Sequence, residues 1–439
     1  MTERVSEVTE GGLVENWAGL SFEERRTGFN ALPRTAAEVF FLDLSAEHQV
    51  ELLQELSPSE KRSWLRLLEP DDAADLIQAL PPEAKEDILQ LLDSTLRREV
   101  TALLAYAEDD AGGLMNPHYV RLRPDLAVDE AIAYLRAQAR GQTETIYYAY
   151  VVANDQKLLG VVSFRELLSA QPTKRVRDIL KSDIVTLPED MDQEEVAMRF
   201  AQHDLLALPV VDKQGCMKGI VTVDDVVGVV QEEATEDIQK IGGTEVLSEP
   251  YLDVGFLKMM KKRVGWLTTL FIGEMLTASA MLHFEHEIAR AVVLALFIPL
   301  IISSGGNSGS QATTLIIRAM ALGEVRLRDW WRVFFRELST GLGLGLVLGL
   351  IGLIRVYFWR SVGADLGEHV WWVGLTVAFS LVGVVLWGSL VGAMLPFGLR
   401  RLGLDPATSS APFVATLVDV TGLVIYFSFA SLFLAGRLL

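Results

Sequence analysis

Five long apolar stretches in the second half of the chain restrict it to a membrane fold. They lie near residues 264–283, 289–317, 338–358, 371–399 and 411–436. Each is long enough for an α-helix to cross the hydrocarbon core of a bilayer, which takes about 20 residues. Because a backbone in lipid must satisfy its hydrogen bonds within its own segment, these stretches predict a transmembrane domain of five helices.

Basic residues around these stretches predict the orientation of the domain. The side that carries most of them has Lys258, Lys261, Lys262, Arg263, Arg318, Arg326, Arg328, Arg332, Arg336, Arg400 and Arg401. The other side has Arg290, Arg355, Arg360 and Arg437. The positive-inside rule therefore predicts that residues 1–260 are cytoplasmic and that the C-terminus lies outside the inner membrane.

The last stretch, APFVATLVDVTGLVIYFSFASLFLAG, contains one charged residue, Asp419. An aspartate near the centre of a membrane helix costs roughly 2.5–3.5 kcal/mol on the insertion scale, and such residues usually face a bundle interior or an ion path. A structural salt bridge is the alternative, but the apolar stretches offer few basic partners at that depth. Asp419 therefore predicts a cation pathway. Glu274, in FIGEMLTASA of the first stretch, either lines that pathway or is protonated and hydrogen-bonded to a neighbouring helix.

The second stretch is polar in its middle. It begins as ARAVVLALFIPLIISS, continues as GGNSGSQATT and ends as LIIRAMALG. Polar groups at membrane depth are tolerated only against protein or a water-filled path. Close packing of helices through small residues explains the glycines, but it leaves Asn307 and Gln311 without a role.

The charge of the chain changes sharply where the membrane half begins. Residues 1–250 contain 24 basic and 47 acidic side chains, a net charge of −23, whereas residues 251–439 contain 15 and 11, a net charge of +4, for a total of −19. The acidic half argues against nucleic acid as a partner and suits a cation. The single Cys216 excludes an internal disulfide, and the polar start MTERVSEVTEGG indicates no cleavable signal peptide.

Residues 20–93 contain a repeat of 12 residues. Leucines stand at positions 20, 32, 44, 56, 68, 80 and 92, and each is followed by helix-start signals such as LSFEE, LSPSE and LPPEA. Serine or aspartate caps, prolines in the first turn and early acids are typical of helix N-termini. The repeat predicts a small solenoid of two-turn helices that bury their leucines on one another.

A second repeat follows the first. YVVANDQKLLGVVSFRELL (150–168) aligns with PVVDKQGCMKGIVTVDDVV (209–227), and the first copy has six extra residues around RGQTETI. Each copy predicts the order strand, helix, strand, glycine turn, strand and helix. A helical, acidic linker that contains EEATEDI then leads to the membrane half.

The second repeat resembles a tandem CBS pair, a module known for sensing ligands. Ser163-x-x-Glu166 and Thr222-x-x-Asp225 fall where CBS pairs can hold a nucleotide ribose. The same spacing is that of a helix capping box, so capping alone also explains it. ATP or another adenine nucleotide is therefore a possible ligand of Thr222 and Asp225.

The order of these parts resembles the MgtE family of magnesium channels and transporters. The most specific likenesses are IPLIISSGGNSGSQATTLIIRAMALGE, EEATEDI, ETIYYAYVV and LVDVTGLVIYF. The resemblance implies a multidomain membrane protein with an all-α cytosolic solenoid of short helices, an α/β tandem CBS pair and a five-helix transmembrane domain. The expected domains are residues 1–110, 111–230, a plug-like linker helix at 231–260, and 261–439.

The resemblance also implies a homodimer in membrane lipid with one ion path at the dimer axis. Asp419 would bind Mg²⁺ there, with Ala415 offering a backbone carbonyl and with Asn307 and Gly306 lining the path. Mg²⁺ gives up its water reluctantly, so one carboxylate per chain plus carbonyls suits a hydrated ion.

Regulatory Mg²⁺ sites carry over by the same resemblance. Asp71 and Asp75, in EPDDAAD, share one helix face because they are four residues apart, and Asp225 is expected to meet them across the domain boundary. The other expected cation ligands are Glu194, Asp204, Glu236, Asp237 and Asp405. High cytosolic Mg²⁺ would bridge the acids and let the linker helix shut the pore, whereas at low Mg²⁺ like charges would repel.

Three positions depart from the family pattern. Gly228 stands where an acid is expected, which would remove or weaken one bridging site. Ala411 stands where some relatives have a pore asparagine, so other divalent ions such as Co²⁺, Mn²⁺ or Ni²⁺ could pass more readily. Glu274 is also unexpected.

The sequence thus predicts a Mg²⁺-selective channel or transporter of the inner membrane, gated by cytosolic Mg²⁺. A broader divalent-cation transporter and a non-conducting, membrane-tethered sensor of cations or nucleotide are the alternatives. A membrane anchor alone would need neither Asp419 nor the polar centre of the second stretch. No nucleophile–base pair, phosphate loop or metal triad is recognisable, so an enzyme is not expected.

Overall fold

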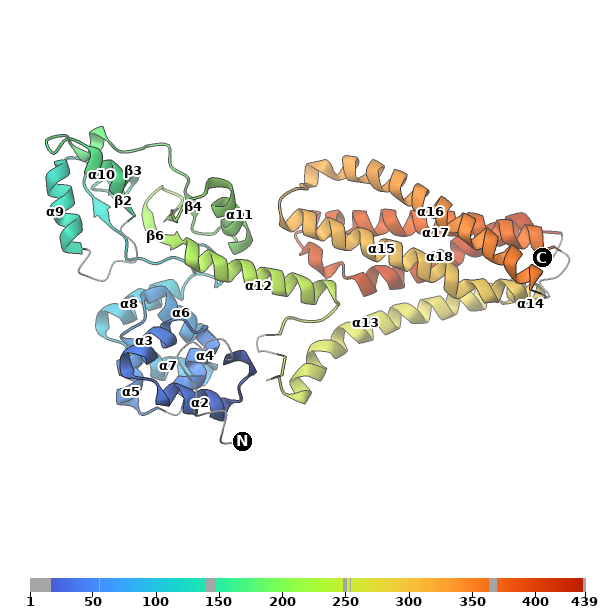
Figure 1. Ribbon diagram of the computed structural model, residues 1–439, viewed down its shortest axis with the longest axis horizontal. Coiled ribbons are helices and arrows are strands. Elements are labelled where there is room, and N and C mark those ends of the chain that lie inside the picture. The colour runs from blue at the N-terminus through green and yellow to red at the C-terminus, as the bar shows by residue number, and fades with distance from the viewer. Residues whose placement is uncertain are drawn as a thin grey trace. The chain divides into compact units, whose positions relative to one another are not determined.

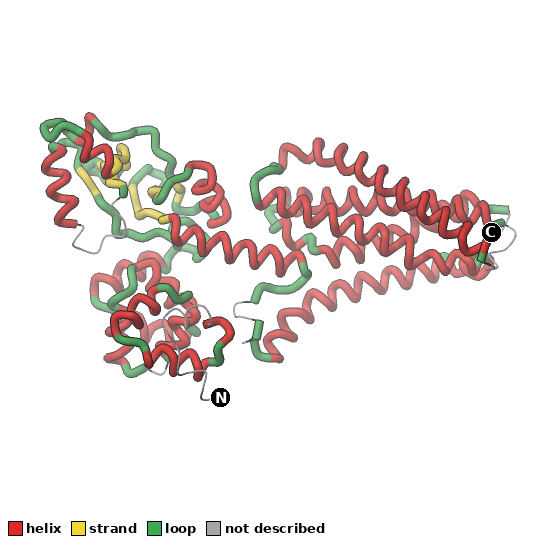
Figure 2. The backbone as a smooth tube through the Cα atoms, in the orientation of Figure 1, coloured by secondary structure: helices red, strands yellow, loops and turns green. Residues whose placement is uncertain are grey.

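The structure is a computed structural model that describes residues 17–54, 56–138, 147–247, 251–252, 254–362 and 369–436. The insertion RGQTETI and Arg437 lie outside the described residues. The chain divides into two compact units, Met1–Gln231 and Glu232–Leu439 (Figure 1). Among the described residues, strands occur only in the first unit, and the second unit consists of helices and the turns between them (Figure 2).

The first part of the first unit is a stack of short helices. After a 3₁₀ turn at Trp17–Gly19 come α2 (Phe22–Ala31), α3 (Arg34–Leu42), α4 (Ala46–Leu53), α5 (Pro58–Leu65), α6 (Pro70–Ala79), α7 (Pro82–Leu91) and α8 (Ser94–Leu103). One helix begins every 12 residues, as the repeat predicts. Local capping explains these starts, since Ser21 and Ser57 form capping boxes with Glu24 and Glu60.

Each repeat leucine lies just after a helix. Leu68, Leu80 and Leu92 are buried, and Leu20, Leu32, Leu44 and Leu56 pack against the same core. Aromatic residues fill its centre, where the rings of Phe41 and Trp64 lie 5.0 Å apart between centroids. Helices of 8–10 residues are marginal in isolation, so this shared core must stabilise them.

The CBS pair forms two small sheets of the same design. The first contains β1 (Arg121–Leu122), β2 (Tyr148–Val152) and β3 (Leu158–Ser163), with α9 (Val128–Gln138) and α10 (Phe164–Ser169). The second contains β4 (Leu187–Pro188), β5 (Ala207–Val211) and β6 (Met217–Thr222), with α11 (Gln193–His203) and the start of α12 (Val223–Ile241). In each sheet the first pair of strands is parallel and the second antiparallel. A 3₁₀ turn at Val176–Asp178 lies between the copies.

Five helices of the second unit are long and apolar enough to cross a membrane. The candidate spans are Phe256–His283, Val292–Ala321, Leu327–Ser361, Val370–Arg401 and Ala411–Leu434. They contain α13 (Phe256–His283), α15 (Ile298–Ala321), α16 (Trp330–Ser361), α17 (Val370–Arg401) and α18 (Ala411–Leu434), and α14 (Glu285–Arg290) links the first two. The 3₁₀ turns are Val292–Phe297, Leu327–Asp329 and Pro406–Thr408. The expected fold class is therefore confirmed.

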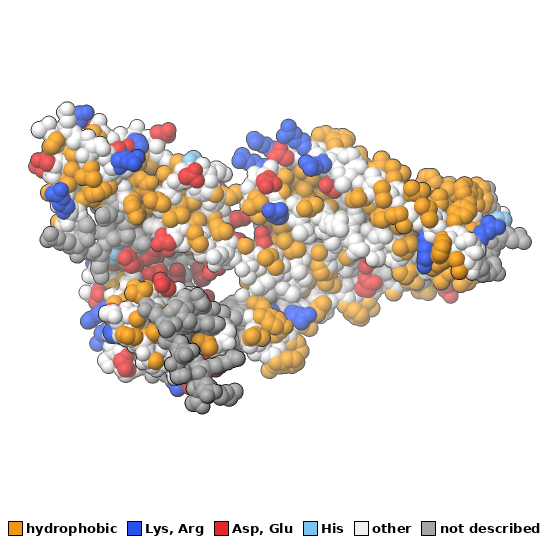
Figure 3. Space-filling view, in the orientation of Figure 1, with side chains coloured by type: hydrophobic (Ala, Val, Ile, Leu, Met, Phe, Trp, Pro, Cys, Tyr) orange, Lys and Arg blue, Asp and Glu red, His pale blue; other side chains and the backbone are white. Residues whose placement is uncertain are grey.

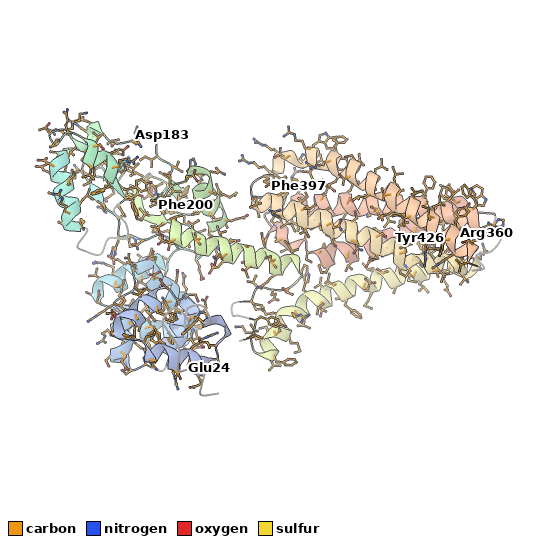
Figure 4. All side chains as sticks on the ribbon, viewed as in Figure 1. Glu24, Asp183, Phe200, Arg360, Phe397 and Tyr426 are labelled. Carbon is orange, nitrogen blue, oxygen red and sulfur yellow. The ribbon has the colours of Figure 1, made fainter. Side chains whose placement is uncertain are left out.

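The surface of the second unit fits this arrangement. Hydrophobic side chains dominate the visible face, and Lys and Arg side chains gather where α15 turns into α16 (Figure 3). The first helix begins at Phe256, eight residues before the predicted 264, because the helix continues through its basic flank. Tyr426, labelled in Figure 4, anchors α18 by donating a hydrogen bond to the carbonyl of Leu294 at 2.9 Å.

Glycines let α15 cross α17 at very short range. A Cβ on Gly388 would clash with the carbonyl oxygen of Gly305, and one on Gly392 would clash with that of Gly309. The hydroxyl of Thr313 also donates to the carbonyl of Gly392, at 2.7 Å. Small-residue packing thus accounts for these glycines of the second span.

The turns between the last two strands differ between the CBS copies. In the second copy Gly215 adopts φ of +80°, as the glycine turn predicts. In the first copy the equivalent residue is Gln156, with φ of 68°, so the expected glycine turn is wrong there. A side chain with a Cβ is strained in this left-handed conformation.

We expect Gln156→Gly to raise the free energy of unfolding by about 1 kcal/mol, because glycine adopts positive φ without steric cost. The measurement is thermal unfolding of the full chain in detergent. Gln214→Gly, at an exposed position of the equivalent turn without positive φ, is the control and should not stabilise. An unchanged or lower melting temperature for Gln156→Gly would contradict the assignment of strain.

Candidate cation sites

The membrane unit places Asp419 beside a glycine of the neighbouring helix. A Cβ built on Gly306 of α15 would lie 3.5 Å from the Cβ of Ala415 and 3.9 Å from Oδ1 of Asp419. Gly306 and Val418 are buried, whereas Asp419 and Ala415 are partly exposed. The absence of a side chain at Gly306 leaves room next to the carboxylate of Asp419. Three of the expected pore residues, Gly306, Ala415 and Asp419, thus lie together.

The exposed edge of α15 is polar. Its exposed residues include Ser303, Asn307, Gln311 and Thr314, which recur at helical spacing, whereas Gly305 and Gly309 on the buried side pack against α17. Asn307 is next in sequence to Gly306, the residue that faces Asp419. Polar side chains on a membrane-embedded surface require protein or water as their neighbour. This edge and Asp419 together are unsuited to lipid.

A second group of carboxylates lies in the first unit, where α6 meets the start of α12. Nδ2 of the fully buried Asn116 donates hydrogen bonds to Oε2 of Glu69 at 2.6 Å and to Oδ1 of Asp71 at 3.1 Å. Asp72 and Asp225 lie close enough to Asp71 to interact with it electrostatically. We call Glu69, Asp71, Asp72 and Asp225 the acid cluster.

Burial and mutual repulsion make the acid cluster hard to ionise. Burial, followed by the nearby charges of Asp72 and Asp225, raises the pKa of Asp71 well above its usual range. Burial, followed by the charge of Asp225, raises the pKa of Asp72 to about 6. Burial also raises the pKa of Asp225, although the hydroxyl of Thr222 opposes this by donating a hydrogen bond of 2.6 Å. Among the described residues, nearby acids rather than basic side chains dominate the charge around these three carboxylates.

The structure brings Asp71 and Asp225 together, and it leaves Asp75 on an exposed part of α6. Sequence reasoning missed Glu69, Asp72 and Asn116. The two acids could have been found in the motif EPDDAAD. Asn116 comes from the start of the CBS pair, before β1, and had no pattern to identify it.

Two other expected ligands lie far apart. Glu194 is in the first turn of α11, and Asp204 follows its end with φ of 51°. Ten residues of helix separate them by about 15 Å. Within this chain they cannot bind one ion together.

A third group of charges surrounds Lys240 near the end of α12. Its Nζ forms an ion pair with Oδ2 of Asp405 at 2.6 Å and a second ion pair with Glu236, one turn earlier. Burial, then the charges of Asp405 and Glu233, raises the pKa of the neighbouring Asp237 to about 6. Glu236, Asp237 and Asp405 are thus near one another, and Lys240, which sequence reasoning missed, supplies the positive charge.

The proposed nucleotide residues take part in helix starts. Thr222 contacts Asp225 as described above, and Ser163 forms a capping box with Glu166. Capping alone therefore explains both contacts. Gly228 is exposed, and nothing lies within 4 Å of a Cβ built there.

Among the described residues, no group of three or more His, Cys, Asp or Glu side chains is arranged to hold a metal ion directly. The donors near Asp419 and in the acid cluster are oxygens, which suit Mg²⁺. A Mg²⁺ ion at either place would keep several of its waters, as this ion prefers.

Comparison with known proteins agrees with a multi-pass membrane protein that carries a cytosolic N-terminal domain. Residues 298–429 match the MgtE family model described as a divalent cation transporter, residues 11–109 match the MgtE intracellular N domain, and residues 111–173 and 176–232 match CBS domains. Magnesium transporter MgtE of Thermus thermophilus is 47% identical over 338 residues, which are 77% of this chain and 73% of that protein. The chain belongs to the MgtE family, as the sequence motifs indicate.

Other relatives agree with this membership. Magnesium transporter MgtE of Enterococcus faecalis is 34% identical over 76% of this chain and 72% of its own length. A crystal structure of the cytosolic domain of the Mg²⁺ channel MgtE in complex with ATP is 42% identical, covers 52% of this chain and 92% of that chain, and has a TM-score of 0.47. Because residues 11–109 match the MgtE intracellular N domain, the N-terminal part of this chain is cytosolic.

The raised pKa values predict how stability depends on pH. Asp72 binds its proton more tightly in the folded chain, so its contribution is fully present below the ordinary pKa of 3.8 and is lost as pH rises through about 6. The wild type therefore loses free energy of unfolding as pH rises. We expect Asp72→Asn to remove on the order of 2 kcal/mol of that pH-dependent loss. The measurement is the melting temperature of the full chain at pH 5 and pH 7.5 without divalent cations.

Asp87→Asn, at an exposed position of the neighbouring helix α7, is the control for this comparison. It should keep the pH dependence of the wild type. The explanation is wrong if the melting temperature of Asp72→Asn falls between pH 5 and pH 7.5 as steeply as that of the wild type.

Proposed function

We propose that this chain forms a Mg²⁺ channel of the inner membrane that cytosolic Mg²⁺ closes. The observation that carries the proposal is a carboxylate at membrane depth, Asp419, beside the Cβ-free space at Gly306. The names of the relatives, magnesium transporters, support Mg²⁺ as the transported ion. A hydrated Mg²⁺ would contact Asp419 and carbonyls such as that of Ala415.

The working unit of this proposal is a homodimer. The polar edge of α15 and the partly exposed Asp419 need a neighbour other than lipid. A second copy about a two-fold axis would cover both with the same surface. Two Asp419 carboxylates would then face one path, with the C-terminus of each chain outside.

Gating follows from the charge of the acid cluster. Asp71, Asp72 and Asp225 repel one another across the contact between the helical repeat and the CBS pair. Mg²⁺ bound there would neutralise them and favour the packed arrangement, whereas low Mg²⁺ would leave the repulsion unbalanced. The regulatory ion would therefore be the transported one.

Helix α12 would carry this change toward the pore. Asp225 lies in its first turn, and Lys240 near its end is paired with Asp405 in the segment between α17 and α18. A shift of one end of a continuous helix moves the other end. We propose that α12 is the plug-like element and that Glu236, Asp237 and Asp405 form a further regulatory cation site.

Other ligands and ions belong to the same proposal. ATP at the CBS pair would have to compete for the contact between Thr222 and Asp225, which also belongs to the acid cluster. Ala411 in place of an asparagine leaves Co²⁺, Mn²⁺ and Ni²⁺ as competing ions. A non-conducting sensor is the alternative class, and membership of a transporter family speaks against an enzyme.

The test is Mg²⁺ influx into proteoliposomes loaded with a Mg²⁺ dye. We expect Asp419→Asn to lower the flux more than about tenfold, because a charged ligand worth roughly 1.5–3 kcal/mol is lost. Glu285→Gln, which removes an exposed acid of α14, is the matched control and should keep normal flux.

Millimolar Mg²⁺ on the cytosolic side should suppress the wild-type flux in the same preparation. Wild-type flux in the Asp419→Asn variant would contradict the pore assignment. No flux from the folded wild type at any Mg²⁺ concentration would favour the non-conducting sensor.

A further inference from the structure

Glu274 of α13 lies level with the pore region of α18. Helix α13 packs along α18, with Trp266 hydrogen-bonded to Ser410 at 3.1 Å and the ring of Phe284 stacked on that of Phe427 at 4.6 Å. In these contacts the residue numbers increase together along α13 and α18, so the two helices run parallel. Glu274 is exposed and lies between these two contacts.

Glu274 and Asp419 lie on the same edge of this helix pair. The two helices touch at Gly273, where a Cβ would lie 2.8 Å from Cγ2 of Thr416. Glu274 follows Gly273 by about 100° of helical rotation, and Asp419 follows Thr416 by about 300°, which turns both side chains to one side of parallel helices. The two carboxylates are close enough to interact electrostatically.

The structure gives neither carboxylate a basic partner. Among the described residues, no ion pair involves Glu274 or Asp419. Two adjacent acids at membrane depth are unfavourable without protons or a cation between them. Positive charge from outside the chain would therefore stabilise Glu274 and Asp419.

A neighbouring hydroxyl independently indicates water at this depth. Thr277 is 8% exposed, and its Oγ1 has no hydrogen-bond partner among the described residues. The other hydroxyls of α13, those of Thr268, Thr269 and Ser279, donate to the carbonyl four residues earlier. The hydroxyl of Thr277 makes no such hydrogen bond. Thr277 lies three residues after Glu274 and is therefore its neighbour on the helix surface. An ordered water is the usual partner of a buried hydroxyl that no protein group satisfies.

We propose that Glu274 is a second carboxylate of the cation path, binding the water shell of a hydrated divalent ion next to Asp419. This inference rests on the proposed function. Each homodimer would present four carboxylates, two from Asp419 and two from Glu274. Asp419 contacts the ion, and Glu274 raises its affinity and favours divalent over monovalent cations.

The first experiment measures the Mg²⁺ concentration for half-maximal flux in proteoliposomes without cytosolic Mg²⁺. We expect Glu274→Gln to raise it about fivefold, the effect of one unit charge at short range in a hydrated path. Glu274→Asp should stay within about twofold of the wild type, and high salt should shrink the effect of Glu274→Gln. Glu285→Gln is the control. If Glu274→Gln leaves the Mg²⁺ concentration for half-maximal flux unchanged, the inference is overturned.

The two proposals fail in different ways. Wild-type flux in Asp419→Asn would overturn the proposed function. If Asp419→Asn lowers the flux more than about tenfold but Glu274→Gln leaves the Mg²⁺ concentration for half-maximal flux unchanged, only the role of Glu274 is overturned.

A second experiment tests the proposal if the Glu274→Gln variant does not assemble. With Cys216→Ser as background, Glu274→Cys is exposed to a membrane-impermeant cationic methanethiosulfonate. We expect modification that blocks flux and that Mg²⁺ slows. A cysteine that does not react lies in lipid or in a dry structural contact, and that result would overturn the proposal.

Discussion

Carboxylates without matching positive charge are the constraint on which the rest of this structure depends. In the acid cluster they are buried and repel one another, so the packed arrangement of the helical repeat on the CBS pair is weakened at neutral pH. In the membrane unit Asp419 lacks a basic partner among the described residues. Where Lys240 supplies the charge, Asp405 and Glu236 are paired directly. A divalent cation would satisfy the other two places.

Helix packing decides where the membrane carboxylate can act. Glycines bring α15 into contact with α17, and this turns Gly305 and Gly309 inward. The opposite edge of α15 then presents Asn307, the next residue after Gly306, on a surface that lipid cannot cover. The small residues of this segment pack against α17. Under the proposed function, its polar residues line the cation path.

Local patterns made much of the fold predictable, and long-range packing limited the rest. The starts of the helical repeat and the five spans follow from caps and hydropathy. The early start at Phe256 was missed because hydropathy does not follow a helix through its basic flank. The resemblance predicted that Asp71 and Asp225 lie near each other, as they do. Asn116 contacts Glu69 across 47 residues and Lys240 contacts Asp405 across 165, and no local pattern reveals such contacts. The left-handed Gln156 was missed because the aligned turn has glycine.

The most direct test of the account is the distance between the helical repeat and the CBS pair as Mg²⁺ changes. Spin labels at the exposed positions of Gln90→Cys on α7 and Gln214→Cys in the second CBS copy, with Cys216→Ser, report it in the full chain by pulsed electron resonance. We expect a broad distribution of distances without divalent cations, and this distribution should narrow with Mg²⁺. We also expect a narrow distribution without Mg²⁺ when Asp71, Asp72 and Asp225 are all changed to Asn. Distributions that do not change with Mg²⁺ would contradict this expectation.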